Sequence, residues 1–78
     1  MNRIIELIGW YGVVTIIGAY ALVSFNVLAS TDLTYQVLNA TGATGIAIES
    51  FHKKDYQPGV LNVIWTVIAM IAIARILF

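Results

Sequence analysis

Cysteine is absent from this sequence of 78 residues, and charge is scarce, with four basic and four acidic side chains. Without cysteine, the chain forms no disulfide and no thiolate metal site. A formal net charge of zero argues against nucleic acid as a partner, because phosphate binding needs clustered basic residues. The single histidine, His52, lacks companion ligands for a metal. We therefore expect no metal, no cofactor and no nucleic-acid partner.

Catalytic motifs are missing as well. The sequence has no nucleophile elbow, no phosphate-binding glycine loop and no pair of catalytic carboxylates. Gly9, Gly12 and Gly18 fall inside a predicted helix rather than between a strand and a helix. We predict that the protein is not an enzyme.

Hydrophobic residues, by contrast, make up 60% of the chain, and the mean hydropathy is +0.90. A soluble domain this small buries too little surface to be stable without disulfides, a bound metal or oligomerisation. A chain this hydrophobic is instead suited to lipid as its solvent. We predict one all-α domain over 1–78, an integral membrane three-helix bundle with helices at about 4–29, 32–51 and 57–78.

The first predicted helix contains 23 consecutive uncharged residues, from Leu7 to Ala29. As a helix this run measures about 34 Å, enough to cross a bilayer with some tilt. It is too long for a signal peptide and has no cleavage site, so we expect it to remain in the mature protein. Arg3 lies just outside the run, at the membrane interface.

The second predicted helix follows Ser30, Thr31 and Asp32, three residues that favour helix N-caps and predict a tight turn. It is the most polar of the three, so we expect its neighbours to shield it from lipid. One stripe along it has alternating steps of four and three and is accompanied by small residues; it consists of Tyr35, Asn39, Gly42, Ile46 and Glu49. The stripe predicts a helix-packing seam.

The third predicted helix has Pro58 in its first turn, the only part of a helix where proline is readily tolerated. Asn62 and Trp65 share one face, where they either line a pocket for a polar solute or pack against lipid or another helix. Buried carboxamides need partners, so Asn39 and Asn62 are expected to form hydrogen bonds between helices or to contact a solute.

Glu49 allows two interpretations. Deep in a bilayer it is a candidate proton relay or cation site, whereas at the interface it pairs with the basic residues that follow it. If all three helices cross the membrane, Arg3, Lys53 and Lys54 lie on one side of it and Arg75 lies on the other. The positive-inside rule therefore places the N-terminus in the cytoplasm and the C-terminus outside.

Two family resemblances follow from longer segments. The segments GWYG, AYALVS, YQVLNATGA and KKDYQPGVLNVIW resemble a family of small uncharacterised bacterial three-helix membrane proteins, over nearly the whole chain. This resemblance implies a multi-pass protein of the bacterial cytoplasmic membrane. More distantly, KDYQPGVLNVIWTVIAMIAIARI resembles the last helix of the SemiSWEET half-transporters, which implies a homodimer and a solute-binding role for Asn62. The proline–glutamine motif of that family is absent.

Two functions remain open from the sequence. One is a non-enzymatic accessory or structural subunit, packed through its helix faces against other membrane subunits or copies of itself. The other is a homodimeric half-transporter of a small polar solute. The candidate interface or solute-path residues are Tyr20, Ser24, Tyr35, Asn39, Gly42, Asn62 and Trp65, and the interfacial charges are Arg3, Glu49, Lys53 and Lys54.

Overall fold

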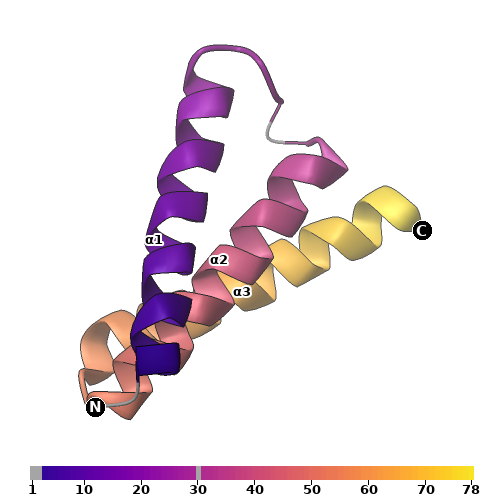
Figure 1. Ribbon diagram of the computed structural model, residues 1–78. Helices are drawn as coiled ribbons and strands as arrows, with labels where there is room; N and C mark the ends of the chain where they lie inside the picture. The colour runs from indigo at the N-terminus through magenta and orange to yellow at the C-terminus, as the bar shows by residue number, and fades with distance from the viewer. Residues whose placement is uncertain (1–2, 30) are drawn as a thin grey trace.

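The computed structural model describes residues 3–29 and 31–78, and these residues form three α-helices (Figure 1). They are α1 (Arg3–Ser24), α2 (Leu33–His52) and α3 (Tyr56–Leu77). The predicted all-α class and the three helices are confirmed. Helix α2 lies between the other two and packs against both, whereas within the described residues no Cα atom of α1 lies within 8 Å of α3. Helices α1 and α2 diverge toward their connection (Figure 1).

Helix α1 ends at Ser24, so the predicted end at 29 is wrong. Asn26 has a φ of +64°, the left-handed conformation that stops a helix. Its N–H donates to Val23 O at 3.1 Å, and the N–H of Val27 donates to Leu22 O at 2.8 Å. These two bonds are the pair that defines a Schellman motif. Asparagine tolerates this conformation better than most residues. Asn26 therefore favours a helix end, but this was missed because the residue lies inside an apolar run.

The C-terminal end of α2 has the same Schellman motif. Lys54 has a φ of +61°, its N–H donates to Phe51 O at 3.1 Å, and the N–H of Asp55 donates to Ser50 O at 2.8 Å. The bounds of α2 and α3 agree with the predicted ones to within one residue at each end. Asp32 is the N-cap of α2, whereas Ser30, which was expected in the same turn, lies outside the described residues.

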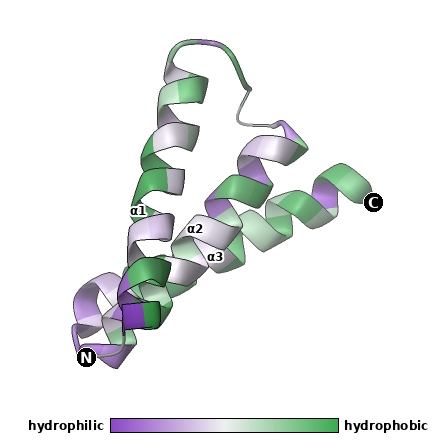
Figure 2. Ribbon diagram, viewed as in Figure 1, coloured by the Kyte–Doolittle hydropathy of each residue, from purple (hydrophilic) through white to green (hydrophobic). Residues whose placement is uncertain are grey.

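Burial in the described residues is inverted relative to a soluble domain. The buried apolar side chains are all alanines, namely Ala19, Ala40, Ala43, Ala47 and Ala69. Large apolar side chains face outward instead, with Trp10 60% exposed and Phe25 78% exposed. Hydrophobic residues accordingly occupy much of α1 and α3 (Figure 2). The interior is therefore formed by close approach of backbones rather than by burial of large side chains.

Two of the helices, α1 and α3, are long and apolar enough to cross a membrane. Each has 22 residues, which corresponds to about 33 Å of helix. Helix α2 has 20 residues and carries more polar side chains, as its sequence predicts. The coarse expectation of a helical bundle with long apolar helices is thus confirmed.

Candidate helix interfaces and pockets

The interface between α1 and α2 is a contact of glycine backbones. A Cβ atom on Gly12 would collide with the carbonyl oxygen of Gly42, and one on Gly45 would lie 2.8 Å from Ile8 O. A Cβ on Gly42 would in turn lie 3.2 Å from Gly12 O. No side chain fits at this crossing without moving a helix. Gly42 was predicted as an interface residue, whereas Gly12 was noted in the sequence without a partner.

Beside this crossing, a polar contact joins the same two helices. The hydroxyl oxygens of Tyr11 and Thr41 are 3.0 Å apart, and Thr41 Oγ1 also lies 3.0 Å from Val37 O, to which it donates. Because Thr41 uses its own proton on the backbone of α2, the Tyr11 hydroxyl is the donor between the helices. The contact is a hydrogen bond between side chains of α1 and α2.

The interface between α2 and α3 uses side-chain hydrogen bonds. Asn39 is only 9% exposed, and its Oδ1 accepts a hydrogen bond from Trp65 Nε1 at 3.3 Å. The hydroxyl oxygens of Thr44 and Thr66 lie 3.4 Å apart across the same interface. Asn39 and Trp65 were both candidate residues, and the structure brings them together. Their pairing was not predicted, because it depends on how α3 docks on α2.

Asn62 lies in a different environment. Its Nδ2 donates to Pro58 O at 2.8 Å, within the first turns of α3. Together with Ile16, Leu61 and Trp65 it lines a hollow of about 200 Å³ between α1 and α3. Asn62 and Trp65 therefore do share one hollow, and the two asparagines bond to different partners.

The other candidate path residues are spread along the bundle. Tyr20 is 69% exposed on α1, and Ser24 is exposed at the last residue of that helix. Tyr35 is half-buried in the first turn of α2. Of the seven candidates, only Asn39 and Gly42 are buried, and Tyr20, Ser24 and Tyr35 lie toward the α1–α2 connection.

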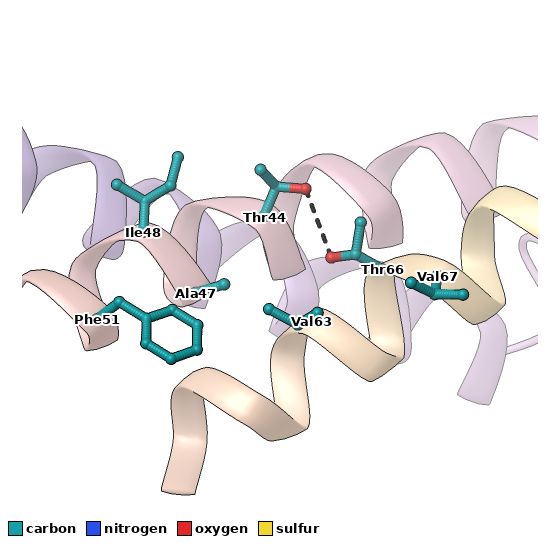
Figure 3. A pocket seen from close by; sticks show the side chains of 7 residues that line it. All are labelled: Thr44, Ala47, Ile48, Phe51, Val63, Thr66 and Val67. Atoms are coloured by element: carbon teal, nitrogen blue, oxygen red, sulfur yellow. Dashed lines mark hydrogen bonds between the residues drawn. The ribbon is translucent and has the colours of Figure 1, made fainter. Parts of the chain in front are cut away.

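An apolar groove of about 440 Å³ runs between α2 and α3 (Figure 3). Thr44 Oγ1 donates to Ala40 O at 2.7 Å and Thr66 Oγ1 donates to Asn62 O at 2.9 Å, so both hydroxyls are bonded to their own helices. The groove is lined by Thr44, Ala47, Ile48, Phe51, Val63, Thr66 and Val67. Apart from these two hydroxyls the lining side chains are apolar, so the groove is mainly a packing surface.

A second pocket, which we call the charged pocket, lies between the beginning of α1 and the end of α2. It has a volume of about 400 Å³, and its lining residues are Glu6, Gly9, Trp10, Val13, Glu49 and Lys53. Glu49 Oε2 lies 3.2 Å from Lys53 Nζ. This ion pair is the arrangement expected of Glu49 at an interface, although only one of the two lysines takes part in it.

The remaining predicted charges lie at the same end of the molecule. Arg3 is the exposed first residue of α1, and Lys54 occupies the left-handed position after α2. Hydrophilic residues gather where the start of α1 meets the α2–α3 connection (Figure 2). Within residues 3–29 and 31–78, no group of three or more His, Cys, Asp or Glu side chains is placed to hold a metal ion.

The fold and its interfaces define a class of protein, a small three-helix bundle with an apolar exterior and an interior of glycine, alanine and a few polar side chains. The chain belongs to an uncharacterised bacterial family, whose family model matches residues 5–78. No curated protein and no solved structure matches it significantly. The comparisons give no support to the expected resemblance to SemiSWEET half-transporters.

Proposed function

We propose that the protein is a non-enzymatic subunit of the bacterial cytoplasmic membrane, which crosses the bilayer with all three helices and packs through its helix faces in a larger or homo-oligomeric assembly. The inverted burial carries this proposal. Large apolar side chains on the outside suit lipid as the solvent, and small residues inside suit helices that associate without a hydrophobic driving force.

The open face of α2 is the reason to expect a partner. Helices α1 and α3 cover two sides of α2 and leave exposed a stripe with alternating steps of four and three, consisting of Val37, Thr41, Thr44, Ile48 and Phe51. Such spacing is the seam along which a further helix packs. A polar helix that is covered on only two sides is better shielded within an assembly than in a lone monomer.

The contacts of the polar candidates favour this structural role over solute transport. Asn39 bonds to Trp65, and Asn62 bonds to the backbone of its own helix. Each carboxamide thus has a hydrogen-bond partner in the protein, through Asn39 Oδ1 and Asn62 Nδ2. A half-transporter would instead leave such groups facing a path shared with a second copy.

The orientation that we propose has the N-terminus and the α2–α3 connection in the cytoplasm. Arg3, Lys53 and Lys54 would lie on that side, and only Arg75 would approach the other. With three crossings, the α1–α2 connection and the C-terminus share the outer side.

Purification tests the proposed role most directly. Membranes that contain the tagged protein are washed at alkaline pH, solubilised in mild detergent and subjected to affinity capture, followed by quantitative mass spectrometry. We expect the protein to stay in the washed membranes and to be recovered with other membrane subunits, or with itself, at a fixed stoichiometry. Release by the alkaline wash would contradict the membrane location, and recovery as a monomer at all detergent concentrations would contradict the subunit role.

A further inference from the structure

We propose that the charged pocket binds the headgroup of a phospholipid that carries an ammonium group, with Glu6 and Glu49 facing the ammonium and Lys53 facing the phosphate. This inference rests on the proposed membrane location. It adds a specific ligand to the apolar surface that the bundle offers to lipid acyl chains.

The pocket depends on a glycine. A Cβ atom at Gly9 would collide with the carboxyl group of Glu49, so the bare backbone of α1 makes room for this carboxylate between the helices. The Glu49 side chain is consequently only 19% exposed, although it is charged. The volume of about 400 Å³ lies within the range of small-molecule sites, roughly 300 to 1,000 Å³.

The charges in the pocket select the ligand. Two glutamates and one lysine line the pocket, so its lining has one formal negative charge in excess, which a cation would balance. Lys53 is 46% exposed and pairs with Glu49 on one side only, so its remaining hydrogens can donate to an anion. A ligand with a cation and an anion a few bonds apart satisfies both signs at once, which neither a metal ion nor a simple anion does.

The pocket is also amphipathic along its length. Trp10 and Val13 follow Glu6 by about one and two turns of α1, and they extend the lining away from the charged end. An indole face attracts an ammonium group, and both side chains pack against hydrocarbon. The charged end lies beside the α2–α3 connection, where hydrophilic residues gather (Figure 2), and this is the level of lipid headgroups in the proposed orientation.

Native mass spectrometry of the purified full chain tests the site. The protein is exchanged into an equimolar mixture of phosphatidylethanolamine and phosphatidylglycerol with identical acyl chains. We expect phosphatidylethanolamine to be retained about tenfold more than phosphatidylglycerol, the factor for one charge-assisted contact, and Glu6→Gln to reduce this ratio to near one. Glu6 is exposed, so its substitution leaves the helix packing intact.

Asp55→Asn is the matched control, because it removes the same charge at the same end of the bundle outside the pocket, and it is expected to keep the wild-type ratio. Equal retention of the two lipids, or an equal loss in both variants, would overturn the site. If millimolar free ethanolamine displaced the lipid, the ligand would be a free amine rather than a lipid headgroup, and the proposal of a lipid site would be wrong. A protein that resists the alkaline wash yet shows no lipid preference would refute the pocket alone, whereas one that is washed out would refute the membrane location as well.

Discussion

The two interfaces of α2 are built differently. Toward α1, glycines bring the backbones into direct contact, and a Cβ added at Gly12 would collide with the backbone of α2. Toward α3, the interface includes side-chain hydrogen bonds, and an apolar groove lies between the helices. Close backbone packing gains many dispersion contacts but tolerates no added atom, whereas the side-chain interface has room to adjust. We infer that α1 and α2 form the fixed part of the bundle and α3 the adaptable part.

Substitution of Gly12 by leucine should have the largest effect, since it forces the two backbones apart. We expect Gly12→Leu to lower the free energy of unfolding by about 3 kcal/mol or more. The measurement is reversible unfolding in mixed micelles of mild detergent and dodecyl sulfate, followed by circular dichroism. Gly18→Leu is the control, because a Cβ there would have no atom of a neighbouring helix within 4 Å. If both variants lost the same stability, the glycine crossing would not be what holds α1 to α2.

The hydrogen bond between Asn39 and Trp65 should have an intermediate effect on the side-chain interface. We expect Asn39→Ala to cost about 1 to 2 kcal/mol, because Trp65 Nε1 then loses its partner between helices. A double-mutant cycle with Trp65→Phe should give a coupling energy of about 0.6 kcal/mol or more.

Asn62→Ala provides the comparison for that result, since Asn62 bonds within its own helix. It is expected to cost under about 0.5 kcal/mol. A larger loss at Asn62 than at Asn39 would reverse the assignment of which asparagine joins the helices.

The threonine pair should contribute least to that interface. Thr44 and Thr66 are 3.4 Å apart and each is bonded to its own helix, so Thr66→Val should change the stability by less than about 0.5 kcal/mol. The same unfolding assay measures this change. A loss above about 1 kcal/mol would mean that the threonines hold α3 in place, and the two interfaces would then differ less than we propose.

The turn between α2 and α3 offers a small change of opposite sign. Lys54 has a φ of +61°, which glycine adopts without steric cost, so Lys54→Gly should raise the stability by about 0.5 to 1 kcal/mol. Asn26→Gly should give less, because asparagine already tolerates a positive φ. Loss of stability on Lys54→Gly would contradict the described turn.

Most of the fold could be predicted from local sequence features. The contacts between helices could not be predicted, because they depend on how the helices pack together. Pro58 and the residues before α2 fixed the starts of two helices, whereas the end of α1 was missed because Asn26 lies inside an apolar run. Asn39 and Gly42, which belong to the stripe predicted as a packing seam, are buried in α2. Their partners, Trp65 and Gly12, could not be assigned because helical spacing gives the face of a residue but not the helix that meets it.

Site-directed labelling across the membrane tests the central claim, that all three helices cross the bilayer with α2 inside the bundle. The natural chain has no cysteine, so Ala29→Cys, Lys54→Cys and Leu77→Cys each provide a single thiol. In intact cells, an impermeant maleimide that reaches only the outer face of the membrane should label the variants at 29 and 77, and label the variant at 54 only after the membrane is opened. Labelling at 29 and 54 from the same side would show that α2 does not cross, and would contradict the account.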